Sequence, residues 1–389
     1  MTPVKRLFIS LLLIIQSLNC FCKEAGIFIH NEIASAQLNY LYDKIKARKN
    51  IPVFENTFLK LRKDFGFNGS VLISVKDQTI YKGAFGYANL ENKDTLTTSS
   101  IYQLASVSKQ FTAAAIILLE EKGLLKFSDP VTRFYPKFPY KKITIQDLLA
   151  HRSGLADYRW FIDPLWQDKQ KPVSNQQMMK LFEEQVPDVY FQPNTRHAYS
   201  NTGYAVLSAI VERITKMKFS TFMQLAFFNP IGMKNTSIYS KCESEVQPGN
   251  LTGYERNGRW KAPNDCYNGI TGDKNVFSSV EDLFLWDQEL YAGKIIQLKN
   301  IEKAYMAANP ELKGWRNYGF GWRINQTNPD KKIVYHTGWW RGYRTYFLRN
   351  LSDHSSIIIL SNTVNCSLNS LQSLYSLVID GNLDSLAID

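Results

Sequence analysis

Two short apolar runs lie at opposite ends of this chain of 389 residues: Val71-Leu-Ile-Ser-Val75 and Ser355-Ser-Ile-Ile-Ile-Leu-Ser361. Their length and their β-branched residues are typical of buried strands. A second alternating run from Thr79 to Tyr87 follows the first, so the two predict a hairpin. Three more strand-like segments precede the last run, at 318–324, 333–337 and 343–349.

Helical patterns fill the stretch between these strands, from about residue 106 to residue 290. Ser278-x-x-Glu281 predicts a capping box for one of these helices, at 279–291. A last helix is predicted from about Ser367 to Ile379. Sequential strands usually pair, and short loops join antiparallel neighbours. The sequence therefore predicts an α+β fold: an antiparallel sheet built from both chain ends, flanked by helices, with an inserted all-helical region.

The composition is that of an ordinary globular protein, with 44% hydrophobic and 21% charged residues. It excludes a disordered tail protein, a collagen-like repeat and a coiled coil. The formal charge is +11, but the runs of positive residues are short. A nucleic-acid-binding protein would gather this charge on one face or arm, so no nucleic-acid partner is expected. A diffuse positive field instead favours anionic polymers or small carboxylates as partners.

Residues 1–22 are typical of a signal peptide. Lys5-Arg6 form a charged segment, 7–18 is mainly apolar, and small residues allow a cut after Cys22. A lipoprotein signal with Cys20 acylated is the alternative. No later stretch reaches 18 apolar residues. The mature protein is therefore expected to be exported, either periplasmic or secreted, with no transmembrane span.

Three cysteines remain after that cut: Cys242, Cys266 and Cys366. In an oxidising compartment this odd number allows one disulfide, for which Cys242 and Cys266 are the favoured pair, and one free thiol. Three separate buried thiols are the alternative. No Cys-x-x-Cys or His-x-x-x-His spacing is present, so neither a metal site nor a cofactor is expected.

Ser106-Val-Ser-Lys109 opens an apolar helix that includes Phe111 and Ile116. Residues i and i+3 of a helix lie roughly 5–6 Å apart at Cβ, so Lys109 can reach the Ser106 hydroxyl. The helix N-terminus supplies free N–H groups, and a desolvated lysine can act as the base that a serine nucleophile needs. Alone, the pattern more often marks an N-cap serine and a surface lysine. The apolar residues that follow favour a buried helix instead.

Two more patterns follow along the chain. Tyr199-Ser-Asn201 lies just before a predicted helix, and a tyrosine beside a lysine can relay a proton. His336-Thr-Gly-Trp339 ends an apolar strand, where a glycine often marks the close approach of another backbone. An edge strand with free N–H groups can bind a peptide by strand addition. Each pattern alone more often reflects ordinary capping, packing or turn structure.

The order Ser-x-x-Lys, Tyr-x-Asn, His-Thr-Gly resembles the serine β-lactamase and penicillin-binding protein superfamily. More narrowly, the chain is similar to the branch of class C β-lactamases, D-Ala-D-Ala carboxypeptidases, related esterases and D-amino-acid peptidases. The resemblance runs from about Phe65 to Asn362, with supporting stretches at 148–155, 199–204, 230–236 and 276–283. We therefore expect an N-terminal helical extension over 23–64 and a β-lactamase-like serine hydrolase domain over 65–380.

The resemblance also implies roles. Ser106 would be the nucleophile that becomes acylated, and Lys109 and Tyr199 would share the base and acid work. The backbone N–H groups of Ser106 and Trp339 would form the oxyanion hole.

The substrate-binding residues that the resemblance implies are Asn201, His336, Thr337, Gly338 and Trp339. Asn201 would orient the substrate amide, and Thr337 would bind a substrate carboxylate or hydroxyl.

The third motif departs from the pattern of most β-lactamases. It begins with His336 where they carry lysine, and Trp339-Trp340 adds bulk. A histidine is mostly neutral above its usual pKa near 6.5, so neutral esters or short D-peptides are favoured over β-lactams. Less charge weakens the hold on an anionic substrate, unless Arg341 or Arg344 on the next strand compensates.

The function expected from the sequence is an exported serine hydrolase that cleaves amide or ester bonds, with a small molecule or a peptide, such as one derived from peptidoglycan, as its partner. The action would be peptidase-like, carboxypeptidase-like or esterase-like. A β-lactamase is one alternative. The alternative of a different class is a non-catalytic module that binds cell-wall peptide or penicillin.

Overall fold

The computed structural model describes residues 51–243, 247–255, 258, 260–262, 265–309, 311–327, 331–365 and 368. The predicted signal peptide, Cys20, most of the predicted extension, Cys366 and nearly all of the predicted last helix lie outside the described residues. The chain divides into two compact units, Met1–Ile51 and Pro52–Asp389, and the fold below is that of the second.

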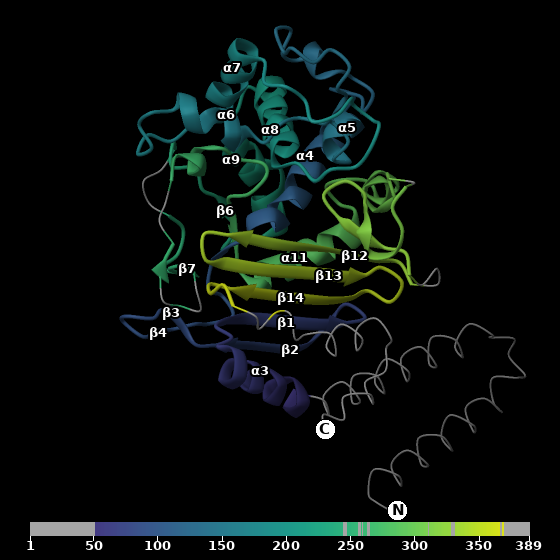
Figure 1. The fold of residues 1–389 in the computed structure, drawn as a ribbon. Coiled ribbons are helices and arrows are strands. Elements are labelled where there is room, and N and C mark those ends of the chain that lie inside the picture. The colour runs from purple at the N-terminus through teal and green to yellow at the C-terminus, as the bar shows by residue number, and fades with distance from the viewer. Residues whose placement is uncertain are drawn as a thin grey trace, which may run out of the picture. The chain divides into compact units, whose positions relative to one another are not determined.

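A seven-stranded sheet lies at the centre of this unit (Figure 1). Its order is β10-β11-β12-β13-β14-β1-β2, and every neighbouring pair is antiparallel. The strands are β1 (Gly69–Val75), β2 (Gln78–Phe85), β10 (Asn317–Tyr318), β11 (Arg323–Asn325), β12 (Ile333–Trp340), β13 (Tyr343–Asn350) and β14 (Ser355–Ser361).

The first and the last strand of the described chain, β1 and β14, are neighbours inside this sheet. β1 pairs with β14 from Gly69↔Ser361 to Ser74↔Ser356, which confirms the predicted antiparallel sheet built from both ends. The segment predicted as one strand at 318–324 is instead the two short strands β10 and β11. The chain turns between them, where the Gly319 N–H donates to the carbonyl of Trp322 and Gly321 has a φ of +78°.

Side chains of β1 alternate between two hydrophobic cores. Leu72 joins the larger core, which extends into the helical part of the unit. Val71 and Ile73 join a smaller core on the opposite face, with Phe54 and Phe58 of α3 (Ile51–Phe65). This alternation is the ordinary consequence of a period of two residues along a strand.

The middle of the chain is mainly helical, as predicted, and Figure 1 shows α4 to α9 grouped beside the sheet. The helices are α4 (Lys109–Glu121), α5 (Ile145–Leu149), α6 (Tyr158–Leu165), α7 (Asn175–Gln185), α8 (Asn201–Thr215), α9 (Phe219–Met223), α10 (Asn229–Ile231), α11 (Val280–Ala292) and α12 (Leu298–Ile301).

Short strands and tight turns connect these helices. The paired strands are β3 (Tyr87–Asn89) with β4 (Asp94–Thr95), β5 (Tyr102–Gln103) and β6 (Ser237–Ile238) with β9 (Val276–Ser278), and β7 (Tyr254–Glu255) with β8 (Trp260–Lys261). The turns used below are the 3-10 segments η1 (Ala105–Ser108) and η4 (Cys266–Gly269).

The cap of α11 lies one residue later than the sequence predicted. The Ser279 hydroxyl, not that of Ser278, accepts the backbone N–H of Asp282. The Ser278 hydroxyl instead forms a buried hydrogen bond of 2.7 Å with Thr236, because Ser278 ends β9 and faces the neighbouring loop.

The disulfide considered between Cys242 and Cys266 is absent, and both are free thiols. Cys242 is exposed and Cys266 is buried, so of these two cysteines Cys266 alone fits the alternative of buried thiols. The Cys242 sulfur lies against Gly269, where an added Cβ would come within 2.6 Å of it. None of the described helices is long and apolar enough to cross a membrane.

Candidate active site

Ser106 lies in the 3-10 turn η1, which leads directly into α4. The sequence predicted that an α-helix would begin at Ser106, whereas α4 begins at Lys109. Ala105 has a φ of +50°, a left-handed conformation that costs an alanine free energy. The turn is held by Leu104, whose N–H donates to Val276 and whose carbonyl accepts from the Thr345 hydroxyl, at 2.8 and 2.7 Å.

Lys109 is completely buried and connects three segments that are far apart in the sequence. Its Nζ donates to the Ser106 hydroxyl at 3.3 Å, to Oδ1 of Asn201 at 2.8 Å and to the backbone carbonyl of Asp273 at 2.8 Å. The same Nζ lies 4.9 Å from the centre of the Tyr199 ring. The structure therefore brings together Ser106, Lys109, Tyr199 and Asn201.

A buried ionic cluster holds the backbone at Asp273. The Tyr158 hydroxyl donates to Oδ2 of Asp273 at 2.9 Å and accepts from Nζ of Lys274 at 2.7 Å, and that Nζ also lies 3.3 Å from Oδ1 of Asp273. Burial lowers the pKa of Lys274 and raises that of Tyr158. Sequence reasoning missed this cluster, because an adjacent Asp and Lys are usually a solvated surface pair.

Tyr199 lies just before α8, and 37% of its surface is exposed. Its ring packs against the buried ring of His151, with centroids 4.3 Å apart. Nδ1 of His151 accepts the N–H of Ser200 at 3.1 Å, and the Ser200 hydroxyl caps α8 by accepting the N–H of Gly203. These contacts fix the backbone from Tyr199 to Asn201, the first residue of α8.

Gly338 allows β12 to lie against the turn that carries Ser106. A Cβ at this position would meet the Leu104 carbonyl at 2.3 Å and the Thr345 hydroxyl at 2.2 Å. The interpretation of this glycine as a point of close backbone approach is therefore confirmed.

Thr337 and Trp339 are exposed on β12, on either side of Gly338. β11 pairs only with Ile333–Tyr335, so the predicted edge strand is covered at its beginning. No described strand pairs with 336–340 on that side. This part of β12 has the open edge that strand addition by a peptide requires.

His336 is buried beneath this edge. Its Nδ1–H donates to the Thr337 carbonyl at 2.8 Å, so Nε2 accepts from the Tyr318 hydroxyl at 2.9 Å. Burial lowers the pKa of His336 well below its usual value, and the positive charges of Arg323 and Lys109 lower it further. His336 is therefore neutral at neutral pH, as the sequence interpretation expected.

Arg323, which sequence reasoning missed, places its guanidinium near Tyr199 and His336. It lies on β11 opposite Tyr335, with its charge 5.4 Å from the centre of the Tyr199 ring. It makes no hydrogen bond or ion pair with the described residues. The predicted compensating residue Arg341 instead forms an ion pair with Asp265. A signal existed, because pairing the strands predicted at 318–324 and 333–337 brings Arg323 close to His336.

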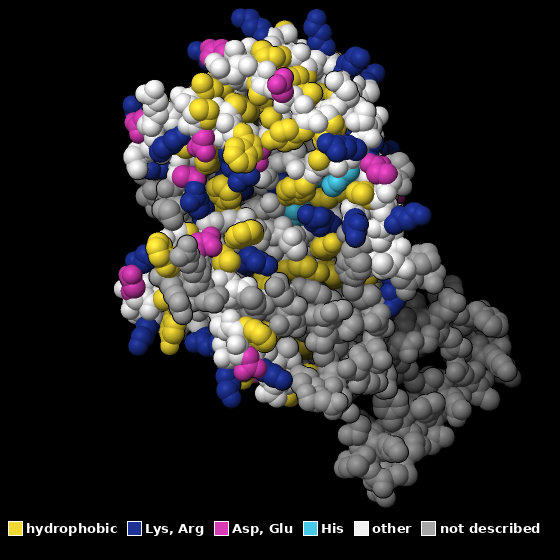
Figure 2. Space-filling view, in the orientation of Figure 1, with side chains coloured by type: hydrophobic (Ala, Val, Ile, Leu, Met, Phe, Trp, Pro, Cys, Tyr) yellow, Lys and Arg dark blue, Asp and Glu magenta, His cyan; other side chains and the backbone are white. Residues whose placement is uncertain are grey.

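No group of three or more His, Cys, Asp or Glu among the described residues lies close enough together to hold a metal ion. In Figure 2, histidine side chains are visible where the helical region meets the sheet, with Lys and Arg side chains beside them. The arrangement offers a partly exposed hydroxyl, a buried amine, a phenol and an amide around one point.

Comparison with known proteins shows the family of this chain. The profile of the Beta-lactamase family matches residues 60–367. Penicillin-binding protein 4* of Bacillus subtilis (strain 168) is 36% identical over 324 residues, which cover 79% of this chain and 71% of that protein. A D-aminopeptidase of Brucella anthropi is 26% identical, over 72% of this chain but only 53% of its own length.

Solved structures share the fold. The octameric penicillin-binding protein homologue from Pyrococcus abyssi has a TM-score of 0.73 at 26% identity, over 86% of this chain and 79% of that one. A D-amino acid amidase from Ochrobactrum anthropi SV3 has a TM-score of 0.69 at 22% identity, over 82% and 94% of the two chains, and supports the fold alone. With the family profile over most of its length and a relative at 36% identity, this chain belongs to the beta-lactamase family and is a serine hydrolase.

Proposed function

We propose that this protein is an exported peptidase that cleaves the last peptide bond of D-amino-acid peptides ending in a free carboxylate. The segment of Lys5-Arg6 followed by an apolar stretch supports export. Relatives described as penicillin-binding proteins and a D-aminopeptidase support a peptide substrate.

The position of Arg323 is the observation that supports a substrate with a free carboxylate. Its guanidinium lies over Tyr199, and no described carboxylate neutralises it. The exposed Thr337 hydroxyl is on the neighbouring strand. An arginine binds a carboxylate through paired, charge-assisted hydrogen bonds, so the carboxyl end of a peptide fits this place.

The reaction proceeds through an acyl-enzyme. The Ser106 oxygen bonds to the substrate carbonyl carbon while its proton passes to Lys109 or Tyr199, whichever of the two is in its deprotonated form. That proton passes to the leaving amine when the C–N bond breaks. Water then attacks the ester on Ser106 by the reverse proton path and releases the acid.

Two groups position the carbonyl. The amide of Asn201, whose oxygen is held by Lys109, makes no hydrogen bond through its N–H₂ to a described residue, so this group can bind the substrate. The backbone N–H groups of Ser106 and Trp339 bind the oxyanion, and one such donor typically contributes about 2.7–4 kcal/mol to catalysis.

The test compares a D-alanyl-D-alanine peptide with its C-terminal amide. The free carboxylate should give the larger kcat/KM, and Arg323→Ala should reduce this preference by about tenfold or more. Arg344→Ala is the rival variant, because the sequence had suggested that residue. Loss of the preference in Arg344→Ala but not in Arg323→Ala contradicts the assignment.

The remaining alternatives give different results. An esterase would hydrolyse neutral esters faster than either peptide, and a β-lactamase would prefer a cephalosporin. A non-catalytic binding module would turn over none of them. Mass spectrometry after a fluorophosphonate or penicillin probe should find a single adduct on Ser106, and the absence of an adduct with both probes favours the binding module.

A further inference from the structure

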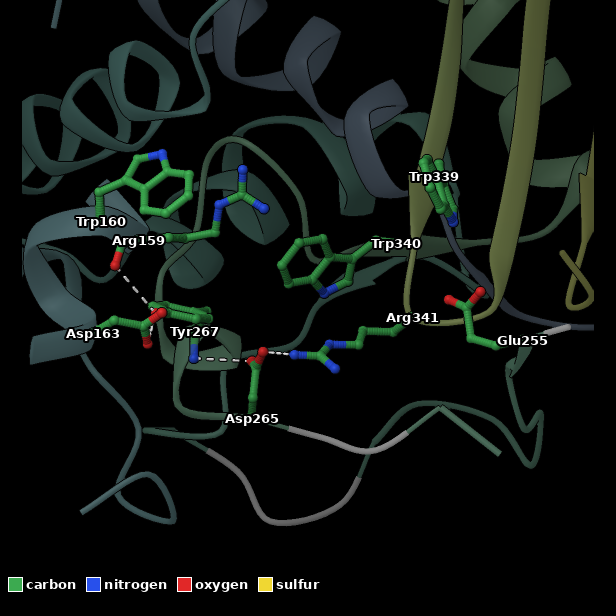
Figure 3. Close-up of a pocket in the computed structure, with 9 residues that line it drawn as sticks. All are labelled: Arg159, Trp160, Asp163, Glu255, Asp265, Tyr267, Trp339, Trp340 and Arg341. Atoms are coloured by element: carbon green, nitrogen blue, oxygen red, sulfur yellow. Dashed lines mark hydrogen bonds and ion pairs between the residues drawn. The ribbon is translucent and has the colours of Figure 1, made fainter. Parts of the chain in front are cut away.

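A pocket of about 520 Å³ begins at the far end of β12, next to Trp339 (Figure 3). Its walls come from α6, from the segment that leads into η4, from β7 and from the turn after β12. Such a volume is within the usual range for small-molecule sites. Trp339 lines this pocket and its N–H is proposed to bind the oxyanion, so the pocket adjoins the proposed position of the reacting carbonyl.

Indole rings line two sides of this pocket. Trp160 on α6 and Trp339 on β12 are 73% and 64% exposed, a large apolar area to leave in water without a partner. Figure 3 shows them on opposite sides, with Trp340 between them. The Trp340 ring already has Nζ of Lys274 and the guanidinium of Arg341 within 5.1 and 5.3 Å of its centre. Trp160 and Trp339 are thus the rings available to a ligand.

The charges of the pocket leave an excess of carboxylate. Arg159 is bound by Asp157, through Nε at 2.9 Å and Nη2 at 2.7 Å. Arg341 is bound by Asp265. Each guanidinium thus has a carboxylate partner, and the lining holds two further carboxylates, Asp163 and Glu255, whose charges also interact with Arg159 and Arg341.

Asp163 and Glu255 lie on opposite sides of the pocket (Figure 3). The Tyr267 hydroxyl donates to Asp163 and lowers its pKa, so Asp163 is ionised at neutral pH. Its ion pair with Lys169 is exposed and therefore contributes little. Glu255 accepts the N–H of Gly342 at 2.9 Å and makes no ion pair with a described residue.

We propose that this pocket, named here the Trp160 pocket, binds an ammonium group on the acyl part of the peptide substrate. Asp163 and Glu255 supply the opposite charge, and the faces of Trp160 and Trp339 supply cation–π contact. The inference rests on the proposed function, because it takes the acyl part of a peptide to lie beyond Trp339.

The length of β12 fits such a substrate. Arg323 pairs with Tyr335, and Trp340 lies five residues further along, about 16 Å on an extended strand. A tripeptide with lysine as the third residue from its carboxyl end covers a similar distance, at about 3.3–3.6 Å per residue plus the side chain. Its carboxylate would lie at Arg323 and its ammonium in the Trp160 pocket.

The test uses two peptides that differ only in charge: Nα-acetyl-L-lysyl-D-alanyl-D-alanine and its Nε-acetylated derivative. The free amine should raise kcat/KM by about tenfold or more, since charge-assisted contacts to two carboxylates are lost on acetylation. Glu255→Gln and Asp163→Asn should each bring the ratio of the two values closer to one. Asp168→Asn, an exposed carboxylate near α6, is the matched control and should keep the ratio.

A second measurement separates this inference from the proposed function. Ser106→Ala, which cannot be acylated, is titrated with both peptides by calorimetry. Tighter binding of the free amine, lost on adding Glu255→Gln, supports the ammonium pocket even if the wild type hydrolyses neither peptide and the proposed function fails. Equal affinities, or equal kcat/KM values in an active wild type, overturn the inference and leave the peptidase assignment intact.

Discussion

The two faces of the central sheet are built from the same strands but pack against different parts of the chain. On the face toward α3, Phe58 packs against Phe67 and Phe85, with ring centroids 5.4 and 5.6 Å apart. On the face toward α11, the sheet buries the ion pair of Arg349 with Asp287. The same larger core extends to α4, where Lys109 bonds to oxygens from three separate segments.

The difference separates stability from chemistry. The α3 face buries aromatic rings, several of them from residues close in sequence to β1, which suits stabilisation. The opposite face buries charged groups that cost free energy unless they are well bonded. Substitutions on the α3 face should therefore change the unfolding free energy, and substitutions around Lys109 should change turnover.

The largest expected effect is at Ser106, the proposed nucleophile. Ser106→Ala should lower kcat on the best substrate by about a thousandfold or more, and Lys109→Ala should do nearly as much, because groups that act as a unit are not additive. Steady-state kinetics with a matched melting temperature for Ser106→Ala checks this. Retention of more than a few per cent of wild-type kcat would show that another residue is acylated.

Tyr199→Phe should have the next largest effect on turnover. It deletes one partly exposed hydroxyl and keeps the ring that packs on His151, so the melting temperature should not change. General acid–base contributions are typically about 10²–10⁴-fold, and kcat should fall by a factor in this range. An unchanged kcat would remove Tyr199 from the proton path.

Phe58→Ala probes the other face of the sheet. Replacing a buried phenylalanine with alanine typically costs about 3–5 kcal/mol of unfolding free energy, measured by urea denaturation. Its kcat, measured well below the melting temperature, should equal that of the wild type, since α3 contributes no side chain to the site. A large loss of kcat in fully folded Phe58→Ala would contradict the separation of the two faces.

Tyr158→Phe tests the cluster behind Lys109. It removes the hydroxyl shared by Asp273 and Lys274, which should cost about 1–3 kcal/mol of stability for the buried groups left unbonded. Because the carbonyl of Asp273 accepts from Lys109, kcat should also fall while KM stays the same. A loss of stability with unchanged kcat would mean that the cluster stabilises the fold without positioning Lys109.

Local patterns were enough to predict the sheet, whereas the candidate site residues came from the order of three motifs and the family resemblance that this order carries. The apolar runs at β1 and β14 carry their own strand signal, and the spacing of Ser106 and Lys109 survives even though η1 is a 3-10 turn. The Asp273–Lys274 pair carries no such signal, and the position of Arg323 follows only once the strands predicted at 318–324 and 333–337 are paired. Their roles depend on contacts between segments more than 100 residues apart, such as Lys274 with Tyr158. Only the folded chain determines those contacts.

Acidification should produce the smallest effect, on stability. Burial lowers the pKa of both His151 and His336 well below the usual value, which is near 6.5 in an unfolded chain. Below that pH the unfolded state binds more protons than the folded state, so stability is complete above about pH 6.5 and falls as the pH drops. Each histidine contributes a slope of at most about 1.4 kcal/mol per pH unit. Urea denaturation at pH 7.5, 6.5 and 5.5 measures this decline in stability. The variant His336→Gln should make the decline shallower. Stability that is constant or rises on acidification would mean that these histidines become protonated in the folded protein.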